Sequence, residues 1–391
     1  MTSLLGSVLC DKNMLEVLIL IINFVLLCIL VLMSRQLFHS LKQSKPPKYT
    51  SALGVDVDLP SVSVCIPARN EAHALMDCLQ KVIASDYEKL EVIVLDDVSA
   101  DNTSALIKSF ASEGVRFVQG SPLKEGWLGK NHALQGLLEE ASGSYVLFMD
   151  VDTRLEPHAV EHMIRYALSH RAAMVSVLPR REDGWRASIF FSPLRYFWEV
   201  IFNRKALPST SSNAWLIRRE TLLAKFDGFK TISSAVQPEA KLAAELAQTN
   251  DYRFLIGSKY FGVGYEKKWR SQLITSVRLL YPLIGERVLL ALLAIVDLLF
   301  FIVPFLVLCV LFPLDLVSVP AIVSSAIVGM GFMALYAVYT HRVWRHGWLI
   351  GSILWPLIVL QEVILIIASL FQYKRRTVKW KGRLIRPEAQ S

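Results

Sequence analysis

Three clusters of polar residues each follow directly after a short apolar run of the sequence. They are Pro67-Ala68-Arg69-Asn70-Glu71, Asp96-Asp97 and Asp150-Val151-Asp152. In the third cluster, two acids at positions i and i+2 bring two carboxylates to one site, and such close like charges are costly unless a cation neutralises them. Proteins usually bind magnesium through one or two carboxylates together with substrate phosphates. The third cluster therefore predicts a site for a hard divalent metal ion.

The other two clusters have a structural interpretation beside the functional one. Acids at a strand end, as at Asp96-Asp97, can bind a ribose hydroxyl or a base N–H group, whereas Asp101 is typical of a helix N-cap. Glu71 would suit the first turn of a helix for its charge alone, because the helix N-terminus is positive. On these residues alone, the role of Glu71 stays open.

The elements that must position these clusters lie in the middle of the chain, at about residues 60–267. Runs of strand length alternate there with segments of helical period. Such alternation with short connections is typical of a parallel, doubly wound α/β sheet, in which ligands bind outside the carboxyl ends of the strands. The expected strands cover 61–66, 90–95, 115–119, 145–149 and 173–178, and the expected helices cover 72–85, 101–112, 130–141 and 157–170.

The remaining sequence is too apolar for an ordinary soluble enzyme. Of the 391 residues, 53% are hydrophobic and 19% are charged, which also excludes a disordered or collagen-like chain. The stretch 17–33 has no charge and is near the short limit for a membrane-spanning helix. Acidic residues precede it and basic residues follow it, so the positive-inside rule places the N-terminus outside and residue 35 onward in the cytoplasm.

Three further apolar stretches fill the C-terminal third: 288–312, 319–340 and 348–371. Three full crossings would leave the basic tail 374–386 outside, although its charge favours the cytoplasm. The Trp355-Pro356 pair indicates a re-entrant hairpin or an in-plane helix for the last stretch. We therefore expect two to three transmembrane helices at this end.

The net charge and the cysteine content bear on whether the chain binds lipid or nucleic acid, and on whether it has disulfides or a zinc site. The net charge of +8 fits loops that face anionic lipid, and we expect no nucleic-acid partner. The five cysteines are too few and too scattered for a disulfide framework or a zinc site.

The expected organisation is an N-terminal anchor at 1–34, a basic linker at 35–59, an α/β domain at 60–270, a C-terminal membrane region at 271–373 and a basic cytoplasmic tail at 374–391.

The motifs PARNE, VLDDVSADNT and FMDVDT, in that order and spacing, resemble the family 2 glycosyltransferases of GT-A fold. The segment SPLKEGWLGKNHALQG (121–136) is similar to the GW-x-GK-x-x-A segment of the family's membrane-bound, lipid-modifying branch. That branch includes carotenoid- and hopanoid-associated enzymes and, more distantly, ceramide glucosyltransferases. The tail VKWKGR (378–383) resembles the WRGR ending of the branch. The resemblance covers about residues 60–270 firmly and the flanks loosely.

The resemblance also assigns roles on the donor side. The residues that match the family's nucleotide-sugar-binding positions are Pro67, Arg69, Glu71, Asp97, Lys130 and Asp150. Asp152 matches the acid that ligates the metal, which the resemblance implies to be Mg²⁺ or Mn²⁺.

The general base of this family is usually the Asp of an ED-x-x-L motif. The matching stretch here is AVQPEAKLAAEL (235–246), in which Pro238 replaces the motif's Glu and Glu239 occupies the base position. Glutamate can act as a base, although its side chain is one methylene longer. A register one residue off would put Ala240 at the base position, and an acid at a helix N-terminus is the structural alternative for Glu239.

Processive members of the family carry a QxxRW motif. The stretch YEKKWRSQ (265–272) has its aromatic and cationic residues in another order, which disfavours long-chain polysaccharide synthesis. Trp269 and Arg270 either flank the diphosphate or lie along the lipid headgroups. The aromatic residues of 188–204 have helical spacing, so we expect an amphipathic helix on the membrane surface.

Together these features imply a membrane-bound, inverting, metal-dependent and non-processive hexosyltransferase. It would move sugar from a nucleotide-diphosphate sugar, UDP-glucose being the first expectation, to a hydroxyl of a membrane lipid. We expect a multi-pass protein of the bacterial cell membrane with a cytoplasmic catalytic domain. Two alternatives remain: transfer to polyprenyl phosphate, which needs no base, and a non-catalytic membrane scaffold that retains a degenerate nucleotide-sugar pocket.

Overall fold

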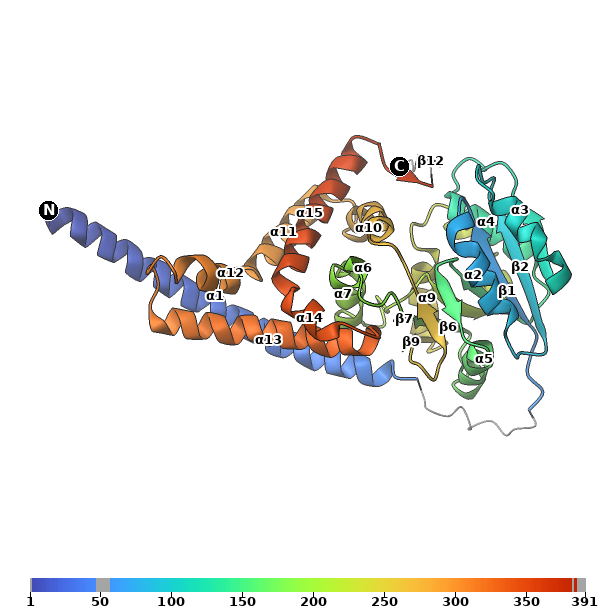
Figure 1. Cartoon of the computed structure of the whole chain (residues 1–391), viewed down its shortest axis with the longest axis horizontal. Coiled ribbons are helices and arrows are strands. Elements are labelled where there is room, and N and C mark those ends of the chain that lie inside the picture. The colour runs from blue at the N-terminus through green and yellow to red at the C-terminus, as the bar shows by residue number, and fades with distance from the viewer. Residues whose placement is uncertain (1, 47–56, 382, 385–391) are drawn as a thin grey trace.

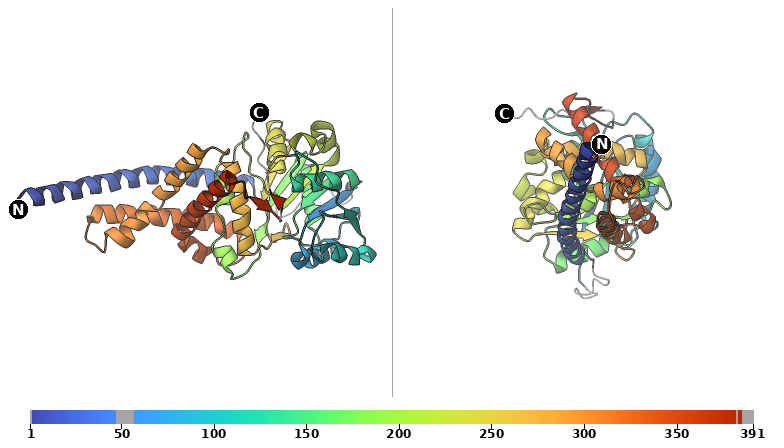
Figure 2. Two further views of the ribbon diagram at one scale, coloured as in Figure 1. Left: turned by 90° about the horizontal axis from the view of Figure 1, so that it is seen from above. Right: turned by 90° about the vertical axis from the view of Figure 1, so that its left-hand side faces the viewer.

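A computed structural model describes residues 2–46, 57–381 and 383–384 of the chain. An α/β domain and a group of apolar helices occupy opposite ends of an elongated molecule (Figure 1). The N-terminal helix α1 (Thr2–Gln43) extends away from the α/β domain along the length of the molecule (Figure 2).

The central sheet has the strand order β3-β2-β1-β4-β8-β6-β9. Its strands are β1 (Val62–Ala68), β2 (Leu90–Asp96), β3 (Val115–Gln119), β4 (Tyr145–Met149), β6 (Met174–Leu178), β8 (Ala214–Arg218) and β9 (Tyr252–Ile256). The five expected strands are all present, and β1 to β4 run parallel, as expected. The sheet is nevertheless mixed, because β8 runs antiparallel to both of its neighbours, β4 and β6.

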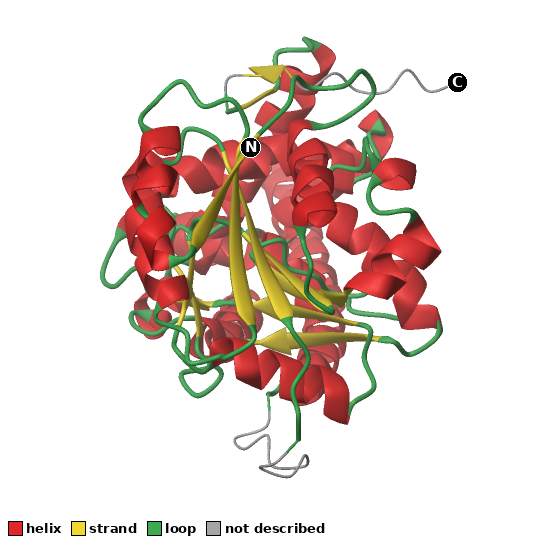
Figure 3. Ribbon diagram, turned by 90° about the vertical axis from the view of Figure 1, so that its right-hand side faces the viewer, coloured by secondary structure: helices red, strands yellow, loops and turns green. Residues whose placement is uncertain are grey.

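Helices cover both faces of this sheet (Figure 3). They include α2 (Ala72–Ile83), α3 (Thr103–Ser109), α4 (Gly129–Glu140), α5 (Ala159–Ser169), α8 (Arg219–Phe226) and α9 (Pro238–Gln248). Successive β1 residues alternate between two cores: Val64 packs with α2, α3 and α5, whereas Cys65 packs with α4 and α9. Burial on both faces explains why the strands are continuous apolar runs.

A small sheet begins at the acidic cluster after β4. It consists of β5 (Thr153–Leu155), β10 (Val263–Tyr265) and β7 (Arg180–Arg181), with β10 antiparallel to β5 and parallel to β7. Register pairs Thr153 with Tyr265, so the chain after β10 passes beside Asp152. The sequence did not indicate this sheet, because its strands have only two or three residues each.

The aromatic segment 188–204 differs from expectation. It forms two short helices, α6 (Ala187–Phe190) and α7 (Arg195–Ile201), instead of one amphipathic helix. Pro193 lies between them, and proline has no N–H to continue a helix. The ring of Phe197 packs at 5.3 Å from Tyr336 and at 5.4 Å from Trp355, measured between centroids, so α7 contacts the apolar helices directly.

Within the described residues, three helices are long and apolar enough to cross a membrane: 12–43 of α1, α13 (Val319–Val343) and α15 (Trp355–Lys374). A fourth candidate is a broken span, in which α11 (Val288–Phe300) meets α12 (Val303–Leu306) and the π-helical turn η3 (Val307–Leu311) at a bend of 42°. These three or four candidate helices agree with the expectation from the sequence of one N-terminal and two to three C-terminal membrane helices. The first helix is longer than the expected anchor, because it continues through residues 35–43 of the expected linker. Residues 47–56 of that linker lie outside the described residues.

Helices α1 and α13 lie side by side and point the same way (Figures 1 and 2). Glu16 accepts a hydrogen bond from Ser318, and Asn23 donates to Ser324 and Ser325 at 2.9 Å each. Both helices therefore run toward the α/β domain.

Helix α15 runs across the direction of α1 and α13 (Figure 1). It follows α14 (Trp348–Ile353) after a break at Leu354 and packs on α10 (Trp269–Leu283) and α11. Its buried Glu362 accepts the backbone N–H of Leu194 at 3.2 Å, just before α7. This course fits the expected in-plane helix, whose place relative to a bilayer stays a prediction.

Candidate active site

The carboxyl ends of β1 and β4 meet at a cleft of about 560 Å³. Most of the residues expected from the sequence line this cleft: Pro67, Arg69, Glu71, Lys130, Asp150, Asp152 and Arg270. The parallel pairing of β1 with β4 brings the first and third polar clusters together, as the doubly wound pattern predicts.

The two acids after β4 are each paired with a lysine. The Lys130 ammonium lies 2.7 Å from Asp150 Oδ1, and the Lys267 ammonium lies 3.2 Å from Asp152 Oδ2. Burial would raise the pKa of Asp150, but the charges of Lys130 and Lys267 outweigh it and hold that pKa below its usual value. Asp150 is therefore ionised at neutral pH, although most of its side chain is covered by protein.

These carboxylates fit a metal that is shared with a ligand. Within the described residues there is no group of three or more histidine, cysteine or acidic side chains that could hold a metal. A cation at Asp152 would therefore take its other ligands from substrate phosphates and water. Mg²⁺ and similar hard ions are commonly bound in this way.

Arg69 and Asp97 form the end of the cleft beside β2. The Arg69 guanidinium lies 4.0 Å from the Asp97 carboxylate and donates to Val98 O at 2.9 Å. Asp97 is 2% exposed and lies behind Arg69, outside the cleft lining. In this structure Asp97 positions Arg69, and its expected contact with a nucleotide stays a prediction.

Glu239 lies in the first turn of α9 and is 1% exposed. Burial raises the pKa of Glu239, Lys130 and Arg195 lower it, and Asp150 raises it further. The carboxyl group is therefore close enough to the Lys130–Asp150 pair to interact with it, although it does not line the cleft. The position fits both the base and the helix-terminus interpretations.

The residue after Lys130 holds the loop that leads into α9. The side-chain amide of Asn131 donates to the carbonyl oxygens of Ile232, Ser233 and Ala235 at 2.8 to 3.0 Å. The GKN segment thus contributes Lys130 to the cleft and also fixes the approach to Glu239.

The catalytic segment can be compared with known proteins. Residues 63–223, which contain both acids of the third cluster and Lys130, match the family model described as Glycosyl transferase family 2. The match places the acidic cluster and Lys130 within a segment that is similar to family 2 glycosyltransferases. The resemblance of the motifs is thereby confirmed at the level of the family.

Two curated relatives align with parts of this chain. An uncharacterized protein of Mycobacterium tuberculosis is 30% identical over 139 residues, and the poly-beta-1,6-N-acetyl-D-glucosamine synthase of Staphylococcus aureus is 36% identical over 112 residues. These alignments cover 36% and 28% of this chain. They span 42% and 26% of the two relatives, which is less than half of either.

A solved structure shares the fold over nearly the whole chain. It is the mannosyltransferase PcManGT from Pyrobaculum calidifontis in complex with GDP-Man and Mn²⁺, with a TM-score of 0.55 and 19% identity. The match covers 90% of this chain and 98% of that one. The expected fold class, a GT-A domain with apolar helices at both ends, is confirmed.

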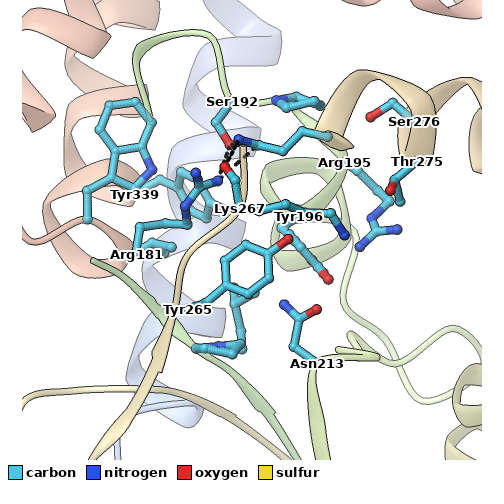
Figure 4. Close-up of a pocket in the computed structure, with 16 residues that line it drawn as sticks. Arg181, Ser192, Arg195, Tyr196, Asn213, Tyr265, Lys267, Thr275, Ser276 and Tyr339 are labelled. Atoms are coloured by element: carbon cyan, nitrogen blue, oxygen red, sulfur yellow. Dashed lines mark hydrogen bonds between the residues drawn. The ribbon is translucent and has the colours of Figure 1, made fainter. Parts of the chain in front are cut away.

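A second, smaller cavity of about 50 Å³ adjoins the donor-side cleft of the glycosyltransferase domain (Figure 4). The two cavities share Lys267 and Thr275. Its walls include Arg195 of α7 and Asn213 before β8. They also include Tyr339 and Val343 of α13 and Trp344 just after that helix. Residues of a candidate membrane helix therefore line a cavity that adjoins the cleft at the acidic cluster.

Arg195 lines this second cavity, and the sequence analysis had considered it only as part of an amphipathic segment. Arg195 Nε lies 3.7 Å from Glu199 Oε1 one helical turn away. Burial raises the pKa of Glu199 to about 7, with Arg195 opposing this shift and Glu239 adding to it. The spacing of Arg195 and Glu199 within an aromatic segment gave no sign of a site, because the cavity wall contributed by Tyr339 and Val343 lies far away in the sequence.

Trp269 and Arg270 were expected on one side of the site, and the structure separates them. Arg270 lines the cleft, whereas the Trp269 indole donates to Gln361 of α15 at 3.4 Å and packs beside Phe191. Both are the first residues of α10, and neighbouring residues of a helix point about 100° apart. Their neighbour Lys267, which the sequence analysis passed over, makes the contact with Asp152.

Proposed function

We propose that the chain is a membrane-bound glycosyltransferase that moves a hexose from a nucleotide-diphosphate sugar to the hydroxyl of a lipid. UDP-glucose is the first donor to test. One observation carries the proposal: the cleft at the acidic cluster shares two lining residues, Lys267 and Thr275, with a cavity that is lined by the end of α13. An acceptor that resides in the membrane has a short way to this cavity.

The donor diphosphate fits the cations of the cleft. Lys130, Lys267 and Arg270 all line it, and charge-assisted hydrogen bonds to phosphate are strong. Asp152 would hold Mg²⁺ or Mn²⁺, and the bound ion would stabilise the departing diphosphate. Asp150 and Lys130 would contact the sugar or ribose beside it. The mannosyltransferase of similar fold, solved with GDP-Man and Mn²⁺, supports this class of ligand.

Glu239 would act as the general base. It takes the proton of the acceptor hydroxyl, the oxygen attacks the anomeric carbon, and the bond from that carbon to the diphosphate breaks with its electron pair leaving on the diphosphate. Attack from the face opposite the leaving group inverts the anomeric centre, so no covalent enzyme intermediate forms. A raised pKa suits this role, because a base works best when its pKa is near the working pH.

Transfer to polyprenyl phosphate is the second candidate. The observation that favours it is the cationic lining of the second cavity, where Arg181, Arg195 and Lys267 gather. A phosphate oxygen is already ionised and needs no base. A Glu239→Gln variant therefore separates the two candidates: it stays active with a phosphate acceptor and loses activity with a hydroxyl acceptor.

A panel of labelled nucleotide sugars tests the proposed function. Membranes that contain the protein are incubated with each donor and Mn²⁺, and lipids are then extracted into organic solvent. We expect label in the lipid phase from one donor, and none with the Asp152→Asn variant. Absence of lipid label together with absence of nucleotide-sugar binding would contradict the proposal and favour the non-catalytic scaffold.

A further inference from the structure

The chain after α15 returns to the donor-side cleft. It forms a hairpin of β11 (Lys379–Trp380) and β12 (Arg383–Leu384), which lies beside the glycosyltransferase domain (Figure 1). Lys381 lies in the turn of this hairpin with a φ of 47°, a backbone conformation that non-glycine residues rarely adopt. The turn places Lys381 in the lining of the cleft, together with Lys130, Asp152 and Lys267.

Two contacts fasten Lys381 to the end of β1. Its ammonium lies 2.6 Å from Glu71 Oε1, and its carbonyl oxygen accepts a hydrogen bond from Arg69 Nε at 3.1 Å. Arg69 and Lys381 are 312 positions apart in the sequence. Arg69 and Glu71, which follow β1, belong to the motif that resembles the nucleotide-binding part of the family.

The base of the hairpin is fixed to the helix group. Tyr373, in the last turn of α15, donates its hydroxyl hydrogen to the carbonyl oxygen of Arg278 at 2.7 Å. Val378, next to the hairpin, is 2% exposed. The hairpin therefore connects α10 and α15 with the cleft, and its position depends on the packing of these helices.

Among the lysines that line the cleft, Lys381 differs in its partner. Lys130 and Lys267 pair with Asp150 and Asp152, the acids expected to serve the sugar and the metal. Lys381 pairs instead with Glu71 at the other wall. A diphosphate that enters between these walls carries more negative charge than Glu71 and would compete with it for the ammonium.

We propose that Lys381 is a donor-binding residue, whose ammonium binds the diphosphate of the nucleotide sugar. This inference rests on the proposed function and deepens it. The donor site is then composite: the glycosyltransferase domain supplies the nucleotide end and the metal ligand, and the C-terminal hairpin supplies one of the cations for the diphosphate.

The test compares nucleoside diphosphates with the corresponding monophosphates by titration calorimetry. Full-length protein in detergent is titrated at constant Mn²⁺ concentration with a panel of bases. Because a hydrogen bond to a charged group contributes about 1.5–3 kcal/mol, Lys381→Ala should weaken diphosphate binding by about 10- to 100-fold. Monophosphate binding should change less than about twofold, because the second phosphate is the proposed contact.

Lys374→Ala is the matched control, because Lys374 is an exposed lysine in the last turn of α15 and lies outside the cleft lining. It should leave both affinities unchanged, and Lys381→Arg should retain most of the diphosphate affinity. Unchanged diphosphate binding in Lys381→Ala would overturn the inference, and so would an equal loss for both ligands, which indicates a structural role. If the wild-type protein binds no member of the panel, the proposed function itself fails.

Discussion

The proposed donor side and the proposed acceptor side of this site, called the donor side and the acceptor side below, are built in different ways. On the donor side, Arg69, Glu71, Asp150 and Asp152 come from two short segments, each directly after a strand. On the acceptor side, Glu239, Arg195 and the end of α13 come from segments that share no local pattern. A strand end fixes its side chains within a few residues, whereas the acceptor side exists only after α7, α9 and α13 have packed. Sequence motifs therefore identify the donor chemistry and leave the acceptor open.

The two sides also differ in the partners and the pKa values of their acidic side chains. On the proposed donor side, Asp150 is paired with Lys130 and its pKa is lowered, whereas burial raises the pKa of Glu71 although Lys381 opposes this shift. Acceptor-side acids are buried, and their pKa values are raised. The first arrangement suits electrostatic binding of a metal and a diphosphate. The second suits proton transfer, because a raised pKa makes a carboxylate a stronger base.

The largest expected loss of turnover comes from a change on the donor side. Asp152→Asn keeps the shape of the side chain and removes the charge that would hold the metal. Metal-ion stabilisation is a matter of several kcal/mol, so turnover should fall by about 10³-fold or more. Sugar transfer is measured by lipid extraction over a range of Mn²⁺ concentrations. Full activity in the presence of a chelator would show that the metal assignment is wrong.

The next effect tests the acceptor side. Glu239→Gln cannot take a proton, and general-base catalysis typically contributes about 10²–10⁴-fold, so we expect kcat to fall by that factor. Glu239→Asp should retain more activity. The measurement is steady-state kinetics at saturating donor. A near-normal kcat in the glutamine variant would move the base to Glu199, the other buried acid near Arg195, or favour a phosphate acceptor.

A smaller effect concerns pH. Burial raises the pKa of Glu239, so the group gains a proton, and stops acting as a base, at a higher pH than an exposed glutamate would. The wild-type kcat should therefore fall as the pH decreases through this raised pKa. Glu239→Gln should lack this limb of the pH profile. If kcat of the Glu239→Gln variant still falls at low pH in the same way, the group that titrates is not Glu239.

The smallest expected effect is on stability, at a contact between α1 and α13 that lies away from the proposed active site. Asn23 of α1 donates to Ser324 and Ser325 of α13 at 2.9 Å each. Hydrogen bonds between membrane helices contribute about 0.6 kcal/mol on average. Asn23→Ala should therefore lower stability by about 1 kcal/mol in detergent, as measured by chemical unfolding, with sugar transfer unchanged. A large loss of transfer would mean that this contact also shapes the acceptor side.

The sequence predicts the part of the fold that local patterns determine. Strands β1 to β4 and β6 are apolar runs of the right length, and each lies where it was expected. The antiparallel strand β8 was not among the expected strands, and its direction depends on the neighbouring strands and not on its own residues. The break at Pro193 was missed for a different reason, since the helical spacing of the aromatic residues outweighed the proline in the interpretation.

The same distinction applies to the site. Asp150 and Asp152 were found because their spacing is itself a signal. Lys267 and Lys381 were not, because a lysine among other basic residues has no spacing to mark it, and only the pairing of β10 with β5 and the return of the chain after α15 bring them to the cleft. Glu239 needed a resemblance to be noticed at all.

The most direct test of the division between the two sides is the binding of the nucleoside diphosphate to Asp152→Asn and Glu239→Gln, measured by titration calorimetry with Mn²⁺. If the sides are separate, Asp152→Asn loses most of the affinity of the wild-type protein. Glu239→Gln then binds with nearly unchanged affinity while transferring no sugar to a hydroxyl acceptor. Loss of nucleotide binding in both variants would contradict the account, because it would place Glu239 on the donor side.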